Sequence, residues 1–273
     1  MKWTKLYFSL GFTVALFFVS CSSSNSENTD TRDTPTKGSI SISVDESFKP
    51  VIEEQLRVHH ASFPATTIRV HYKSEADCFR DLQQDSTRMI IVAKGLTEKE
   101  AEFYKSTLSY KPQYAELAYD AVAVIVNSEA KDSSVLKKGE FGKNVVAANS
   151  SQEVIDIVSQ RTDVIGFVGL SWIGDSYDPK QLAYLRKIRL SRIECTACLE
   201  RNVFAKPSQA TITRGEYPLA RPLYYILKEN TAGLGTGFMN FMSLERGQLI
   251  FRRAFLAPAK MAFHKRLSSI KQE

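Results

Sequence analysis

The sequence predicts an α/β protein built as two lobes on mainly parallel sheets, and three observations carry that prediction. Strand-type and helix-type patterns alternate along the first third of the chain, which is the order of a parallel sheet with helices on its faces. The run Met89–Ala93 is apolar throughout and bounded by polar residues, as in a parallel strand covered on both faces. At 273 residues the chain is long enough for one or two lobes.

The first third reads as strand, helix, strand, helix and strand. Gly38–Val44 alternates polar and apolar residues, and the helix after it has Ser47 as its expected cap and Pro50 in its first turn. Thr67–Tyr72 is the second predicted strand, and Ser74 is expected to cap the second helix. The apolar run described above completes the pattern.

The rest of the chain continues this alternation after a polar stretch over residues 128–144 that has no clear period. The later predicted elements are a helix over 97–107, strands over 121–127 and 145–148, a helix from Ser150 and Ser151 through Gln160, a strand over 164–169, a basic strand or hairpin arm over 182–190, and helical packing over 237–256.

The composition excludes several classes of protein. With 43% hydrophobic and 24% charged residues, the chain is not a disordered, collagen-like or many-pass membrane protein. The 36 Lys and Arg exceed the 30 Asp and Glu only mildly, and they are spread along the chain. Nucleic-acid binding is therefore not expected.

The N-terminal segment predicts export. Lys2 and Lys5 precede an apolar run over residues 6–19, which is too short to span a hydrocarbon core of about 30 Å. We interpret residues 1–20 as a signal peptide that is removed from the mature protein.

The end of that run resembles the lipobox of bacterial lipoproteins. A small residue precedes Cys21 and a serine-rich linker follows it, although Phe18 stands where an aliphatic residue is usual. The resemblance implies acylation of Cys21, with residues 21–37 as a flexible tether. The protein would then be lipid-anchored in the bacterial cell envelope and face the periplasm, on the inner or the outer membrane. Ordinary cleavage near a structural cysteine is the alternative.

The remaining cysteines favour a structural role. Cys195 and Cys198 are spaced for a local disulfide, but no strand-to-helix context supports a redox motif, so a disulfide or two idle thiols is expected. A zinc site would need two further ligands, and the four histidines are remote from this pair in sequence. His59 and His60 lie at the end of a predicted helix and are expected to be surface or packing residues. No metal or cofactor is predicted.

Six segments in order carry a family resemblance. Ile165–Trp172 reads like an Ile-Gly-Tyr-Val-Gly return strand, and Glu216–Tyr224 reads like Tyr-Pro-Leu-x-Arg-Pro-Leu-Tyr. The other four are Ile42–Pro50, Met89–Leu96, Tyr119–Asn127 and Phe241–Gln248. Together they resemble the phosphate-binding proteins of bacterial phosphate ABC transporters, a family of periplasmic type II solute-binding proteins. The resemblance covers most of residues 38–256.

The resemblance implies a periplasmic-binding-protein-like fold and a transport function. It divides the chain into a first lobe over residues 38–125, a shortened second lobe over 126–205, and a return to the first lobe with C-terminal helices over 206–273. The protein would capture inorganic phosphate in the cleft between the lobes and deliver it to a membrane permease, as a monomer and without enzyme activity. The sequence supports that last point, since it carries none of the common catalytic motifs.

The expected binding groups are those that hold an oxyanion. Unpaired backbone N–H groups at helix N-termini, hydroxyls and a cation suit this chemistry. Ser47 and Ser74 lie at helix starts that follow parallel strands, and Lys94 stands where the family often has Arg. The alternative is that both serines only cap their helices and that Lys94 is solvated.

Two departures from the family weigh against a standard phosphate site. Asp45 and Glu46 replace the family's Gly-Ser, so one carboxylate would have to accept a proton from monobasic phosphate while the other points away. Residues 128–164 contain no Gly-Ser-Gly-Thr loop, which leaves Ser150 and Ser151 as the second-lobe donors. The alternatives are therefore another oxyanion, such as sulfate or molybdate, or an envelope scaffold that has lost its ligand.

Overall fold

The computed structural model describes residues 33–107, 110–131, 135–136, 145–175, 177–229 and 231–261. The predicted signal peptide, the lipidation site at Cys21 and most of the predicted tether lie outside these ranges. All of these described residues belong to one compact unit. Within the described ranges, we find no helix with the length and apolar character needed to cross a membrane.

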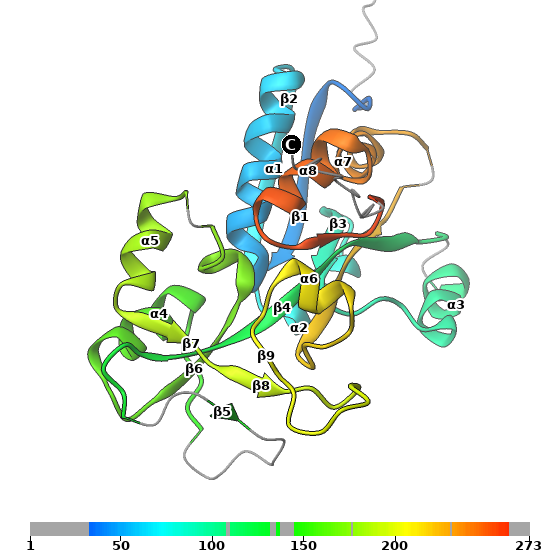
Figure 1. Cartoon of the computed structure of the whole chain (residues 1–273). Coiled ribbons are helices and arrows are strands. Elements are labelled where there is room, and N and C mark those ends of the chain that lie inside the picture. Colours follow the sequence, from blue (N-terminus) through cyan, green and yellow to red (C-terminus); the bar gives the residue numbers. More distant parts are fainter. Residues whose placement is uncertain are drawn as a thin grey trace, which may run out of the picture. The chain divides into compact units, whose positions relative to one another are not determined.

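The main sheet contains the three strands predicted in the first third of the chain, which are β1 (Gly38–Asp45), β3 (Thr87–Val92) and β2 (Thr66–Lys73). Its strands are arranged β11 (Ala257–Pro258), β4 (Gln113–Asn127), β10 (Ala220–Leu227), β3, β1 and β2 (Figure 1). β1 is parallel to both β2 and β3, whereas β10 is antiparallel to β3 and to β4. Consequently β1, β2, β3 and β4 run in one direction. β10 runs against them because it returns from the second sheet.

Helices pack on both faces of this sheet. Met89 and Ile91 belong to a core shared with α1 (Lys49–Ser62), α7 (Leu234–Ser243) and α8 (Glu245–Arg253). Ile90 and Val92 belong to a second cluster, with residues of α2 (Glu75–Leu82) and α3 (Glu98–Thr107). Because successive side chains of a strand point to opposite faces, β3 is buried on both, which confirms the interpretation of its apolar run.

β4 continues from the first sheet into a second one. Its residues Val122–Val126 pair with β6 (Ile165–Gly169), and its last residues pair with β7 (Ile188–Leu190). α4 (Ser151–Gln160) contributes to the core of this part. The smaller elements here are η2 (Leu170–Trp172), α5 (Pro179–Leu185), α6 (Gln209–Thr213), and a sheet of β5 (Val135–Leu136), β8 (Arg192–Glu194) and β9 (Phe204–Ala205).

The core around β6 and α4, called the second core below, also includes residues late in the chain. Ile212 and Tyr217 are buried in it, and the Tyr217 hydroxyl donates to the Val122 carbonyl oxygen at 2.8 Å. The chain is thus still packed in this core beyond residue 206. The lobe limits at 125/126 and 205/206 stay a prediction.

Several predicted helix starts are confirmed by their hydrogen bonds. Pro50 lies in the first turn of α1. Ser74 accepts a hydrogen bond from the Asp77 amide at 3.3 Å, and Ser150 accepts one from the Glu153 amide at 3.2 Å. These two hydroxyls satisfy N–H groups that have no partner within the first helical turn.

Three local expectations were wrong. Ser47 does not cap α1, because it lies inside a 3₁₀ turn, η1 (Glu46–Phe48), whose cap is Asp45. Residues 145–148 form no strand. The segment 182–190 is the end of α5 followed by β7, so only its last part is extended.

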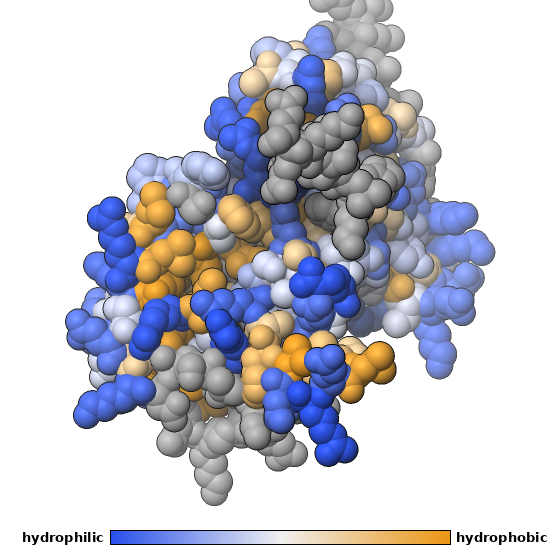
Figure 2. Space-filling view, in the orientation of Figure 1, coloured by the Kyte–Doolittle hydropathy of each residue, from blue (hydrophilic) through white to orange (hydrophobic). Residues whose placement is uncertain are grey.

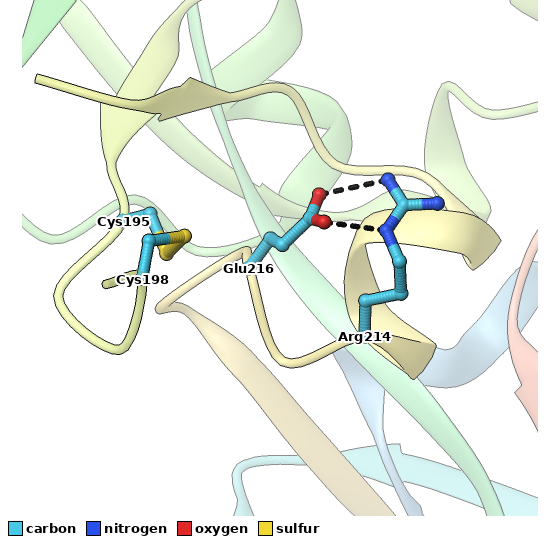
Figure 3. Close-up of a disulfide and its surroundings, with 4 residues drawn as sticks. All are labelled: Cys195, Cys198, Arg214 and Glu216. Carbon is cyan, nitrogen blue, oxygen red and sulfur yellow. Dashed lines mark hydrogen bonds and ion pairs between the residues drawn. A yellow bond between two sulfur atoms is a disulfide. The ribbon is translucent and has the colours of Figure 1, made fainter. Parts of the chain in front are cut away.

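The local disulfide is confirmed. Cys195 and Cys198 are bonded in the loop after β8, and Figure 3 shows the nearby Arg214–Glu216 ion pair on a neighbouring segment. Cys78 is free and buried. His59 is also buried and packs against the rings of Phe63, Phe238 and Phe241, which fits a packing role.

Candidate functional site

The candidate site is centred on the turn that follows β1. Asp45 Oδ1 accepts a hydrogen bond from the Ser47 amide at 2.9 Å and another from Ser47 Oγ at 2.7 Å. Such a turn is a local alternative to helix capping, because an Asp side chain reaches the backbone N–H two residues later. The donors of Ser47 that were expected to serve an external anion are therefore directed at a carboxylate of the chain itself.

An arginine from β10 joins this turn. Arg221 Nη2 donates to Ser47 Oγ at 2.8 Å, and its guanidinium lies over the Phe48 ring, 4.6 Å from the ring centroid. The aromatic face and the hydroxyl fix the orientation of the guanidinium. The Arg221 side chain is 24% exposed, so this cation is only partly screened by water.

Arg221 forms an ion pair with a buried carboxylate on the neighbouring strand β4. Asp120 lies opposite it in the β10–β4 register and accepts from Arg221 Nε at 3.2 Å and from Nη2 at 3.0 Å, both at Oδ2. Asp120 is fully buried, and its Oδ1 has no hydrogen-bond partner. Burial raises the pKa of the Asp120 carboxyl, while the neighbouring Arg221 opposes that rise.

The same turn connects the two sheets. The Ser47 carbonyl oxygen accepts from Trp172 Nε1 at 3.1 Å and from Ser171 Oγ at 3.4 Å, and both donors belong to η2. No residue larger than glycine fits at position 169, because an added Cβ would lie 2.8 Å from the Ser47 carbonyl oxygen. β6 and η2 are thus packed directly against the turn that carries Ser47.

Glu46 makes the second link between the two parts. Its Oε2 accepts from Ser151 Oγ at 2.7 Å, and both carboxylate oxygens lie 3.2 Å from the Ser151 amide nitrogen. Ser151 is the first residue of α4, where the helix dipole and its unpaired N–H groups favour a negative charge. The carboxylate of Glu46 therefore occupies the anion-binding end of α4.

Two other predicted site residues have different partners. Lys94 Nζ donates to Glu100 Oε1 at 2.7 Å, and this bond, together with the amide and hydroxyl of Thr97, lowers the pKa of Glu100 to about 2. Ser74 is engaged by Asp77, as the cap of α2. None of the hydrogen bonds of the described residues joins Ser74 or Lys94 to the turn around Ser47.

The structure therefore brings together Asp45, Glu46, Ser47 and Ser151, with Ser150 next to them as the cap of α4. It adds Asp120 and Arg221, which were not among the predicted site residues. The sequence could have indicated both residues, because each is a charged residue next to a largely apolar strand segment. Only the register of β4 against β10 shows that they face each other.

A groove opens beside this site, between α1 and α5. Its volume is about 720 Å³, and it shares Ser171 and Trp172 with the contacts of the Ser47 carbonyl. Cations and carboxylates both line it, including Lys49, Glu53 and Lys180. In Figure 2, hydrophilic surface over α1 lies beside a more apolar area at the left of the view.

The donor set suits an oxyanion better than a metal. The hydrogen-bond donors around Ser47 are two hydroxyls, backbone N–H groups and a guanidinium, which are the usual ligands of phosphate and sulfate, although each of them is already paired with a carboxylate of the chain. Among the residues that the structure describes, no three His, Cys, Asp or Glu side chains are grouped as metal ligands.

Comparison with known proteins supports the fold. Residues 29–163 match the family model described as "PBP superfamily domain". A putative phosphate ABC transporter substrate-binding protein with bound phosphate from Clostridium perfringens has 18% identity and a TM-score of 0.57, over 82% of this chain and 100% of that one. An ABC-type phosphate transport receptor from Vibrio cholerae has 15% identity and a TM-score of 0.56, over 81% of this chain and 100% of that one.

The same fold also occurs in proteins of another kind. An H2O2-bound OxyR mutant from Corynebacterium glutamicum has 10% identity and a TM-score of 0.51, over 81% of this chain and 69% of that one. None of the curated proteins matches the sequence. At these identities the structural matches establish the periplasmic-binding-protein-like fold, and function has to be inferred from the site.

Proposed function

We propose that this protein, whose residues 29–163 match the model of a PBP superfamily domain, is the substrate-binding component of a phosphate ABC transporter. It would capture inorganic phosphate in the cleft beside Ser47 and deliver it to a membrane permease. The observation that carries the proposal is the junction of Ser47, Arg221 and the N-terminus of α4, because it gathers oxyanion donors from both parts of the fold. The two phosphate-protein structures with the same fold support the choice of anion.

The site residues have distinct roles in this proposal. Ser47 Oγ and the Arg221 guanidinium would bind the anion from the first sheet. Ser150 and Ser151 would supply a hydroxyl and the helix N-terminus from the second, while Asp45 would accept a hydrogen bond from the protonated oxygen of monobasic phosphate. Ser74 and Lys94 are paired with Asp77 and Glu100, so they would make no direct contact with the anion.

The cellular setting is also a proposal. The lipobox-like segment around Cys21 supports a lipid-anchored protein in the cell envelope, and the PBP superfamily is typical of periplasmic receptors. The protein would act as a monomer, without enzyme activity, next to the permease that it supplies.

Isothermal titration calorimetry tests the proposal. Residues 22–273 would be titrated with phosphate, sulfate and molybdate at pH 7, because this range contains every residue that the structure describes. Saturable heat with phosphate, reduced about tenfold or more in affinity by Ser47→Ala, is the expected result. Ser62→Ala is the matched control, because Ser62 lies at the end of α1 away from Ser47, where its hydroxyl donates to the Val58 carbonyl and accepts from Arg246. Saturable heat with sulfate or molybdate alone would show that the protein binds that oxyanion instead of phosphate.

One observation favours a second candidate. The donors of Ser47 and Ser151 are already engaged by Asp45 and Glu46, so the fold is complete without an external anion. The second candidate is an envelope scaffold that has kept the lobes and lost its ligand. It predicts no heat and no thermal shift with any of the three anions.

A further inference from the structure

The cleft contains more carboxylates than an anion receptor needs. Asp45, Glu46 and Asp120 each accept hydrogen bonds there, and Arg221 is the one cation among their described partners. An incoming oxyanion therefore meets a site that is net negative and whose donors are engaged. A mechanism for releasing those donors has to be part of binding.

The same arrangement recurs at another strand end. The Ala93 amide, directly after β3, donates to Glu75 Oε2 at 2.7 Å. This is the end of the strand where Lys94 was expected to help bind the anion, and Lys94 itself is paired with Glu100. The N–H groups and cations expected to bind an anion are thus repeatedly satisfied by carboxylates of the chain.

Glu46 differs from the other carboxylates because its bond joins the two parts of the fold. Asp45 and Glu75 accept from neighbouring residues of the first sheet and its helices, whereas Ser151 is 105 residues away from Glu46 and begins a helix of the second core. In binding proteins of two lobes, a ligand favours the closed form by contacting both sides. The Glu46 carboxylate makes that kind of two-sided contact without a ligand.

We infer that Glu46 is an internal ligand of this protein: its carboxylate bridges the two lobes at the N-terminus of α4 and must be displaced before an external oxyanion binds. Competition with phosphate rests on the function proposed above, but the bridge itself does not. With a built-in competitor, the apparent affinity for phosphate equals the intrinsic affinity multiplied by the fraction of molecules in which the competitor is released. The cleft would therefore fill only where phosphate is abundant.

Two variants test the inference. Glu46→Ala removes the carboxylate, and Glu153→Ala is the matched control. Glu153 is also in the first turn of α4, but its carboxylate accepts from Asn149 and does not reach the first sheet. Glu46→Gln provides a second version of the test if the alanine variant does not fold, because it keeps the side-chain length and removes the charge.

The first measurement is amide hydrogen exchange at Ser151 without any added anion. Ser151 is a first-turn residue with no acceptor within its helix, so its protection depends on Glu46. We expect the amide to be protected in the native protein and in Glu153→Ala, and to exchange about tenfold faster or more in Glu46→Ala. Unprotected Ser151 in the native protein would overturn the bridge.

The second measurement is calorimetric titration of the same proteins with inorganic phosphate. We expect Glu46→Ala to bind phosphate about tenfold more tightly than the native protein, and Glu153→Ala to match the native protein. Equal affinity in Glu46→Ala and the native protein would overturn the competition. Faster exchange in Glu46→Ala, with no binding of phosphate by any variant, would support the bridge and contradict the proposed function.

Discussion

Removal of the Arg221 guanidinium is the perturbation whose energetic effect follows most directly from the structure. Arg221→Met keeps most of the side-chain volume over the Phe48 ring but deletes both hydrogen bonds to Asp120 Oδ2. Asp120 is fully buried, so its charge would be left without a charged partner. The loss therefore includes the cost of an uncompensated buried carboxylate as well as the two bonds.

The expected magnitude is large for a single substitution. Breaking a buried ion pair from one side costs about 3–5 kcal/mol. For a chain of this size, a loss of about 4 kcal/mol lowers the melting temperature by roughly 8–16 °C. Asp120→Asn combined with Arg221→Met removes the unpaired charge and should recover about 2 kcal/mol of that loss.

The substitution also predicts a pH dependence with a definite sign. Burial already raises the pKa of Asp120, and loss of Arg221 raises it further. The folded variant then binds a proton that the unfolded chain has released above a pKa of about 3.9. Its stability should therefore fall as the pH rises from about 4 towards 7, and acidification should restore part of it.

Urea denaturation followed by circular dichroism, at pH 5 and pH 7, measures these quantities. Arg214→Met is the matched control, because Arg214 also pairs with a carboxylate through two hydrogen bonds but is exposed. That control should show little change. A loss below about 1 kcal/mol in Arg221→Met, or no recovery in the double variant, would show that the pair does not stabilise the fold as described.

Three further predictions concern stability. Burial lowers the pKa of His59 to about 4, so the stability of the protein should fall as the pH drops from about 6.5 towards 4. In urea titrations at about pH 4.5 and 6.5, His59→Phe should reduce this dependence of stability on pH. An unchanged dependence in the variant would contradict the prediction. Replacement of both Cys195 and Cys198 by Ser should cost at most about 2 kcal/mol in the same assay, because the bond closes a loop of sequence separation 3; a greater loss would indicate a wider role. Ser150→Ala should cost about 1 kcal/mol and increase amide exchange at Glu153, whereas unchanged exchange would exclude the cap.

The sequence predicted best where local patterns decide the structure. Met89–Ala93 was identified as a strand buried on both faces, and Ser74 and Ser150 were identified as caps, because each depends on periodicity or on a side chain within three residues. Ser47 shows the limit of that reasoning. Asp45, two residues earlier, competes for the same N–H groups and converts the expected cap into a 3₁₀ turn.

The site itself depended on long-range geometry. Asp45 and Glu46 were recognised as unusual at an anion site, but the sequence does not show that Glu46 reaches Ser151 across 105 residues. Asp120 and Arg221 lay within segments quoted for the family resemblance, yet their pairing follows from strand register, which the sequence does not show.

A crystal structure of the Glu46→Ala protein grown with phosphate tests the central claim most directly. The claim is that the junction of Ser47, Arg221 and the α4 N-terminus is an oxyanion site, and that Glu46 occupies its Ser151 donors in the native protein. We expect phosphate to accept hydrogen bonds from the Ser151 amide, Ser47 Oγ and the Arg221 guanidinium. An unoccupied junction, with Ser47 still bonded to Asp45 while phosphate binds elsewhere or not at all, would contradict the claim.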